Sequence, residues 1–120
     1  MGVYVDGFVL PVPKRNTAAY RRMARTAGKV WRDHGALDYV ECIADDVKPG
    51  KWTSFPQSVK LKKGEAVWFS FIVYKSRKHR DAVLKKAMAD KRLAHMMDPK
   101  TLPFDAKRMF WGGFKAMVRV

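Results

Sequence analysis

Four polar side chains fall on one face of a predicted β-sheet, where together they could carry out acid–base chemistry. Successive residues of a strand point to opposite faces of its sheet, and this alternation places on one face Asp6, Glu41, Ser70 and Lys115. Burial raises the pKa of a carboxyl group, whereas a neighbouring lysine lowers it. Two interpretations stay open: an acid–base role, or mutual pairing, because buried charges need partners. We predict in particular a buried pair between Asp6 and Lys115 on neighbouring strands.

The same face, called the mixed face below, also carries large aromatic side chains. Beyond the four polar residues it collects Tyr4, Phe8, Tyr39, Trp68, Tyr74, Met109, Trp111 and Met117. Such a surface is too aromatic for water and too polar for an ordinary core, and large exposed apolar patches usually mark an interface or a ligand site. We therefore predict a homodimer that joins two mixed faces around a cleft for a small molecule. The predicted ligand-binding residues are Asp6, Glu41, Trp68, Ser70, Tyr74, Trp111 and Lys115.

The order of the elements that would position these residues predicts one ferredoxin-like α+β domain spanning residues 1–120. Apolar periodicity gives the order strand, helix, strand, strand, helix, strand, with strands at 3–12, 37–46, 66–74 and 108–118. This βαββαβ order builds an antiparallel sheet, in strand order 4-1-3-2, with both helices on one face. We expect the helices to cover the wholly apolar face, which includes Val67, Phe69, Phe71 and Val73. An extra strand is predicted within 54–61, since a long structureless loop is unusual.

Positive charge is the unusual feature of the composition. The 120 residues include 25 Lys and Arg but only 11 Asp and Glu, which gives a formal net charge of +14. Most of the excess lies in the two predicted helical segments, 14–34 and 75–92. It indicates either solvated helix faces or a footprint for a polyanion such as RNA. The residues that would carry the second function are Arg21, Arg22, Arg25, Lys29, Arg32, Lys78, Lys85 and Lys86.

Several other classes of site are disfavoured. His34, His79 and His95 fall on separate segments without metal-ligand spacing, so no metal site is predicted. Cys42 is predicted to pack under a helix, and the chain has no nucleotide-binding or nucleophile motif, so no cofactor is predicted. No apolar run is long enough to span a membrane, and the first residues do not resemble a secretory signal. The expected location is therefore the cytoplasm.

Several short motifs, spread over the whole chain, resemble the YbaA-like family of uncharacterised proteins in the dimeric α/β-barrel superfamily. They are Tyr4-Val5-Asp6-Gly7-Phe8, Gly35-Ala36-Leu37, Val40-Glu41-Cys42, Met88-Ala89-Asp90, Pro103-Phe104-Asp105, Lys107-Arg108-Met109 and Gly112-Gly113-Phe114. The resemblance implies a homodimer with a barrel-like interior and implies no known activity. It does not explain the charge of this chain, because the family is much less basic.

Three functions follow from these expectations. The first is binding of a small molecule, with or without chemistry, in a cleft on the mixed face. The second is nonspecific RNA or polyanion binding by the basic helices. The third is an assembly module whose mixed face serves only as an interface. The residues alone do not decide whether a reaction is catalysed.

Overall fold

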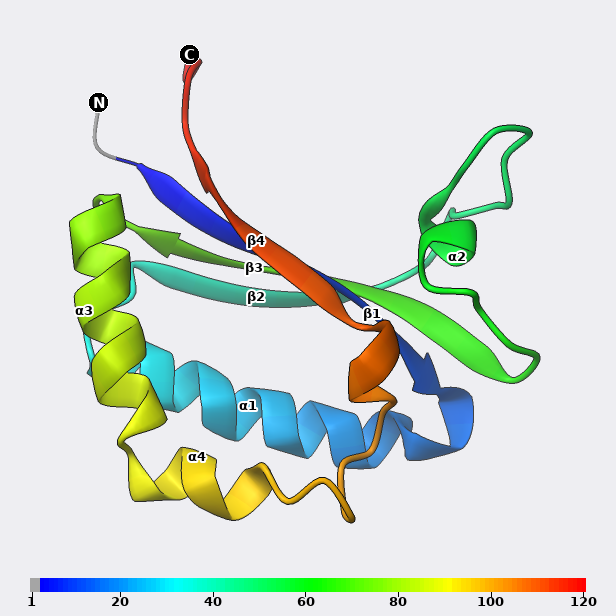
Figure 1. The fold of residues 1–120 in the computed structure, drawn as a ribbon, viewed down its shortest axis with the longest axis horizontal. Helices are drawn as coiled ribbons and strands as arrows, with labels where there is room; N and C mark the ends of the chain where they lie inside the picture. Colours follow the sequence, from blue (N-terminus) through cyan, green and yellow to red (C-terminus); the bar gives the residue numbers. More distant parts are fainter. Residues whose placement is uncertain (1–2) are drawn as a thin grey trace.

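The computed structural model describes residues 3–120 and builds them into one four-stranded sheet with helices (Figure 1). The strands are β1 (Tyr4–Pro13), β2 (Asp38–Ile43), β3 (Glu65–Tyr74) and β4 (Phe110–Lys115). The helices are α1 (Thr17–Asp33), α2 (Phe55–Ser58), α3 (Arg77–Met88) and α4 (Lys91–Met96), and short 3-10 turns precede α1 and β4. The predicted ferredoxin-like α+β fold is confirmed, with α2 and α4 as additions to the basic order.

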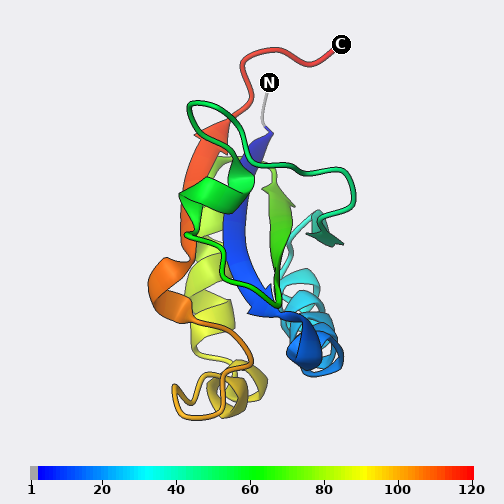
Figure 2. The same cartoon turned by 90° about the vertical axis from the view of Figure 1, so that its right-hand side faces the viewer.

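The strands lie in the order β2-β3-β1-β4, and each neighbouring pair is antiparallel (Figure 2). This confirms the predicted order 4-1-3-2. Residues directly opposite each other on antiparallel strands share a face, and the register sets Glu41 opposite Ser70, and Ser70 opposite Phe8. Asp6 lies two residues before Phe8 on β1 and so has the same orientation. The predicted membership of the mixed face therefore holds for these residues.

Local signals explain where two of the helices begin or end. Ser76 precedes α3, and its hydroxyl accepts a hydrogen bond from the backbone N–H of His79, as expected of a capping serine. Gly35 follows α1 with a φ of +112°, a left-handed conformation that glycine adopts without steric cost. These two residues fix the edges of the helical layer that lies against the sheet.

The helices cover the mixed face, which is the opposite of the prediction. Figure 1 shows α1 and α4 along one side of the sheet and α3 at one end of the same side. Residues of the mixed face form the core with them: Tyr4, Ile72 and Tyr74 pack with Trp31 of α1 and Val83 of α3. The prediction was wrong because it chose the core face by its apolar content alone. The polar groups of the mixed face are instead satisfied by partners on the helices.

The opposite face of the sheet, called the open face below, is apolar and largely uncovered. Its side chains include Phe69, Phe110 and Phe114, which are 42%, 47% and 66% exposed. Cys42 also lies on this face and is exposed, so the prediction that it packs under a helix was wrong. The open face is thus the side of the sheet that the helices α1, α3 and α4 leave uncovered.

Only one end of the open face is covered, by the segment that contains α2 (Figure 1). Val59 packs there against Val9 and Val67. The prediction of an extra strand within 54–61 was wrong, because this segment contains the short helix α2 instead. Ser54 accepts a hydrogen bond from the backbone N–H of Gln57, and a proline stands in the first turn, where its missing N–H costs nothing.

Candidate ligand-binding site

A cavity of about 290 Å³ lies between the mixed face and the helices. Its walls are mostly apolar and aromatic, and the strands and helices that surround it contribute Phe8, Leu10, Tyr20, Met23, Ala27, Trp31, Ile72, Leu84, Leu93, Phe104 and Met109. Three polar side chains of the sheet reach the same space: Asp6, Glu41 and Ser70. Mostly apolar walls with a few convergent polar groups are the usual form of a small-molecule site.

The cavity opens toward solvent at the end formed by α3, α4 and β4. Three of its lining residues, Met88, Met97 and Trp111, are 54%, 51% and 50% exposed. Methionine side chains are flexible and polarizable, so a rim made of them can adapt to ligands of different shape. The opening would let a molecule reach the interior without crossing the sheet.

Glu41 is held at the β2 side of the cavity by two tyrosines. The hydroxyl of Tyr20, from α1, donates to Oε1 at 2.9 Å, and that of Tyr39 donates to Oε2 at 2.8 Å. Burial raises the pKa of Glu41 above its usual value, while the two tyrosine hydrogen bonds oppose this shift. Burial, followed by the nearby Glu41 charge, also raises the pKa of both tyrosines. Both phenols therefore stay protonated and can hold the carboxylate in place.

Asp6 lies at the other end of the face and is 1% exposed. Its carboxylate accepts a hydrogen bond from the Arg80 guanidinium of α3, with Nη1 and Oδ1 3.1 Å apart. Burial raises the pKa of Asp6, and the charge of Arg80 opposes this effect. The same guanidinium lies over the rings of Tyr4 and Trp111, at 5.2 Å and 5.8 Å from their centres. Arg80 thus replaces water around a buried carboxylate.

Six of the seven predicted ligand-binding residues divide into three groups. Asp6, Glu41, Ser70 and Trp111 line the cavity together. Tyr74 is buried beside it, where its hydroxyl accepts a hydrogen bond from Trp31 Nε1 at 3.0 Å. Trp68 is buried against Tyr20 and lines a different hollow, described next.

Lys115 lies outside the site, and its predicted pairing with Asp6 was wrong. It is exposed near the end of β4 and stands opposite Tyr4, while Asp6 stands opposite Gly113. The partner that was missed, Arg80, is buried on α3 with Val83 and Ala87. These three residues follow the spacing i, i+3, i+7 that marks the inner face of a helix. That spacing was the available signal for a buried arginine.

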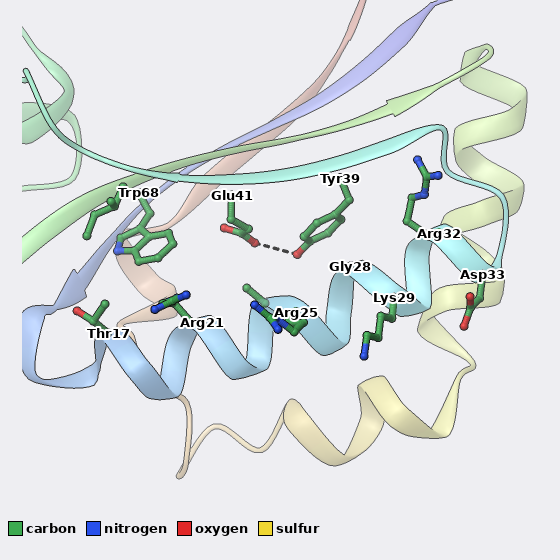
Figure 3. Close-up of a pocket in the computed structure, with 12 residues that line it drawn as sticks. Thr17, Arg21, Arg25, Gly28, Lys29, Arg32, Asp33, Tyr39, Glu41 and Trp68 are labelled. Carbon is green, nitrogen blue, oxygen red and sulfur yellow. Dashed lines mark hydrogen bonds between the residues drawn. The ribbon is translucent and has the colours of Figure 1, made fainter.

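A second hollow, called the basic groove below, runs between α1 and the edge strand β2 (Figure 3). It has a volume of about 800 Å³. One wall carries the basic side chains of α1, and the floor carries aromatic and small residues of β2, β3 and α1. The residues lining it include Thr17, Arg21, Arg25, Gly28, Lys29, Arg32, Tyr39, Glu41 and Trp68. Glu41, Tyr39 and Ala24 line both the groove and the interior cavity, so these side chains separate the two.

Two structural features are absent from residues 3–120. Across this part of the chain no group of three or more His, Cys, Asp or Glu side chains is arranged to hold a metal ion. None of the helices in the same range combines the length and the apolar character required to cross a membrane.

The arrangement defines a ferredoxin-like α+β protein whose helices enclose a cavity against the sheet. The same fold occurs in a solved structure of SnoaB, described as a cofactor-independent oxygenase from Streptomyces nogalater. That structure matches with a TM-score of 0.56 and 12% identity, covering 100% of this chain and 98% of the other. At this identity the likeness shows the fold and nothing about activity.

The family is shown by closer relatives. Residues 3–106 match the family described as "Protein of unknown function (DUF1428)". The chain is 45% identical over 115 residues to the uncharacterised protein YbaA of Escherichia coli K12, covering 96% of this chain and 97% of the relative. YbaA of Shigella flexneri matches to the same extent. The chain therefore belongs to the DUF1428 family, and the predicted YbaA-like resemblance is confirmed.

Proposed function

We propose that the protein binds a small, mostly apolar molecule in the interior cavity. The observation that carries this proposal is the pairing of apolar walls with the anchored carboxylate of Glu41. A ligand with an apolar body would displace water from those walls, and a hydroxyl on it would donate to an acceptor already fixed by two tyrosines. The volume of about 290 Å³ suits a body of one or two rings. The oxygenase description of SnoaB belongs to that protein, and fold likeness alone assigns no reaction to this chain.

Filling the cavity tests this proposal. Ala27 of α1 lines the interior cavity and not the basic groove, so Ala27→Leu places a larger side chain into the space a ligand would use. The probe is 1-naphthol, which combines an apolar double ring with one hydroxyl. We expect Ala27→Leu to weaken 1-naphthol binding at least tenfold, measured by isothermal titration calorimetry. Such a loss corresponds to about 1.4 kcal/mol or more.

The matched control is Ala18→Leu, the same change at an exposed position of the same helix. It should leave the affinity for 1-naphthol unchanged. Chemical shift changes in a two-dimensional NMR spectrum of the wild type should gather on cavity residues such as Leu84. Wild-type protein that binds no 1-naphthol, or a loss of affinity as large in Ala18→Leu as in Ala27→Leu, would contradict the proposal.

We further propose that two copies join through their open faces to form the homodimer expected from the resemblance. The sequence-based prediction had assigned the interface to the mixed face, which the helices of the same chain cover. The open face supports the new assignment because it is apolar across all four strands, and its phenylalanines are partly exposed. A patch of this kind usually marks a protein interface. The face also has a dent at Gly7, where a Cβ would meet no atom within 4 Å.

Nonspecific nucleic-acid binding is a second candidate function. The observation that favours it is the exposure of all eight residues proposed for it on α1 and α3. Contacts between basic side chains and phosphates release counterions, so affinity falls steeply with salt. We expect a single-stranded RNA 12-mer to bind weakly at about 50 mM salt and roughly 300-fold more weakly at about 200 mM, if about six phosphates are contacted. Fluorescence anisotropy measures the affinity at both salt concentrations. Absence of binding at the lower salt excludes this function.

A further inference from the structure

The basic groove between α1 and β2 differs from an ordinary solvated helix face. Its cationic wall consists of Arg21, Arg25, Lys29 and Arg32, which follow one another at three- or four-residue spacing. From the first to the last the wall extends about 16 Å, given a rise of ~1.5 Å per residue. Figure 3 shows Arg21, Arg25 and Arg32 along α1, below the strand that carries Tyr39 and Glu41, while the Lys29 side chain points away from that strand. The helix thus concentrates positive charge along one side of a concave surface.

The charges of this wall are largely uncompensated. Among residues 3–120, no ion pair is found for Arg21, Arg25 or Lys29. The acidic groups nearby are already engaged. Asp33 pairs with Arg92 of α4 at 2.8 Å, and both oxygens of Glu41 accept tyrosine hydrogen bonds. The tyrosine hydrogen bonds do not cancel the charge of Glu41, but the four cations of the wall outnumber it. An anion near Arg21 and Arg25 would therefore be attracted, and a concave surface strengthens this attraction by focusing the field.

The floor of the groove is apolar, so it could contact an apolar part of a ligand in addition to an anionic group. Trp68 and Ile43 lie there with Tyr39, whose ring packs closely against Gly28. The contact is tight, because a Cβ on Gly28 would lie 2.9 Å from the Tyr39 ring. A flat apolar group could cover this floor, while an anionic group of the same molecule contacts the basic wall.

A buried donor at the groove adds a second, independent observation. The indole ring of Trp68 lies above Thr17 and Arg21 in Figure 3, and the residue is 5% exposed. Its Nε1 has no hydrogen-bond partner among residues 3–120. A buried donor without a partner is unfavourable, and most native donors of this kind are satisfied. Nε1 is covered by neighbouring side chains, so an anionic oxygen bound near Arg21 would supply the missing acceptor after a side-chain shift that uncovers it.

From these observations we infer that the basic groove is a second ligand site, for an amphipathic anion that carries a phosphate or carboxylate on a flat apolar body. The anionic group lies between Arg21 and Arg25, within reach of the Trp68 indole, and the apolar body lies over Tyr39 and Ile43. This site is separate from the interior cavity of the proposed function, although Glu41 and Tyr39 form part of both walls.

Matched probes separate the contributions of charge and apolar body. 1-Naphthyl phosphate carries both, 1-naphthol carries the same rings without the anion, and inorganic phosphate is the anion alone. In a buffer of low salt that contains no phosphate, we expect 1-naphthyl phosphate to bind to the full chain at least tenfold more tightly than inorganic phosphate. The indole N–H resonance of Trp68, assigned through Trp68→Phe, should shift with 1-naphthyl phosphate and not with 1-naphthol.

Charge-matched variants locate the site. Arg21→Gln with Arg25→Gln should weaken 1-naphthyl phosphate at least tenfold. Lys85→Gln with Lys86→Gln removes the same charge from exposed positions of α3, outside the groove, and should change the affinity less than twofold. All four side chains are exposed, so both variants should fold; circular dichroism verifies this. Equal losses in the two variants, or an unmoved Trp68 resonance, would overturn the inference and leave the charge as a general polyanion footprint.

The variants also keep the two proposed sites apart. Ala27→Leu fills the interior cavity and should leave 1-naphthyl phosphate binding intact. If Ala27→Leu abolishes it, the phosphate binds in the interior and the groove proposal is wrong. If the wild type binds 1-naphthyl phosphate but not 1-naphthol, the cavity proposal is wrong and the groove proposal stands.

Discussion

Replacing Asp6 with alanine will lower the free energy of unfolding by about 3–5 kcal/mol, because it leaves the Arg80 guanidinium buried without its carboxylate. The pair is enclosed: the side chain of Asp6 is 2% exposed and that of Arg80 is 10% exposed. Arg80 keeps an ion pair to Asp81 at 2.9 Å, but the Asp81 side chain is 58% exposed and is a weak substitute. Urea denaturation of the purified variant measures the change.

Two controls show whether the ion pair is responsible. Lys115→Ala should leave the unfolding midpoint unchanged, since Lys115 is exposed and does not pair with Asp6. Adding Arg80→Met to Asp6→Ala should recover part of the lost stability, because it removes the unpaired charge and fills the space with an apolar side chain. A cost for Lys115→Ala equal to that of Asp6→Ala would contradict the pairing described here.

The element order and the sharing of faces could be predicted from the sequence because both depend on local periodicity. Alternation placed Asp6, Glu41 and Ser70 on one face, and the register confirms this. The βαββαβ order then limits how the strands can be arranged, and the predicted order was right. These features need no knowledge of what lies above or below the sheet.

The strands alone could not predict which face of the sheet the helices cover, because this depends on hydrogen-bonding partners that the helices carry. Tyr20 and Trp31 of α1 and Arg80 of α3 satisfy polar groups of the mixed face. Because its polar groups form hydrogen bonds with these partners, the mixed face can be buried and forms the core. The wholly apolar face, which needs no polar partners, is left largely uncovered. The apolar content of the two faces shows which is more hydrophobic. It does not show which face will meet hydrogen-bonding partners on the helices.

The interior cavity was predicted only in part, because alternation along the strands identifies its sheet wall but not its helical wall. Four of its residues, Asp6, Glu41, Ser70 and Trp111, were named as ligand-binding residues from strand parity. Its helical wall was missed, since α4 and the methionines near it enter only when the chain folds back under the sheet. The basic groove was missed as a concave feature, although its arginines were named. A pattern of charges on a helix does not show whether a neighbouring strand leaves a hollow beside it.

The open face yields the second large effect: Phe69→Glu should convert a homodimer into monomers. Phe69 is 42% exposed at the middle of the face and packs against Phe55 and Phe71. A carboxylate there would be buried without a partner in the dimer, at a cost of several kcal/mol, whereas it would face water in the monomer. A cost of about 3 kcal/mol weakens dimerisation roughly 100-fold. Sedimentation velocity at micromolar concentrations measures the shift.

The control for this variant has the same exposure on the other side of the sheet. Leu37 is also 42% exposed, but it precedes β2 with the parity of Tyr39, on the helix side. Leu37→Glu should leave the dimer intact. Trp68→Arg, a change on the mixed face, should unfold the chain, since Trp68 belongs to the core with Leu10 and Tyr20.

The outcome also decides between the two faces as interfaces. If the wild type sediments as a dimer and Phe69→Glu as a folded monomer, the open face is the interface and the helix-covered cavity lies away from it. A wild-type protein that sediments as a monomer at about 10 μM would contradict the proposed dimer. A dimer that survives Phe69→Glu but not Leu37→Glu would place the interface at the helical side. The basic groove would then be partly covered by the second copy, and the affinity for 1-naphthyl phosphate should depend on protein concentration.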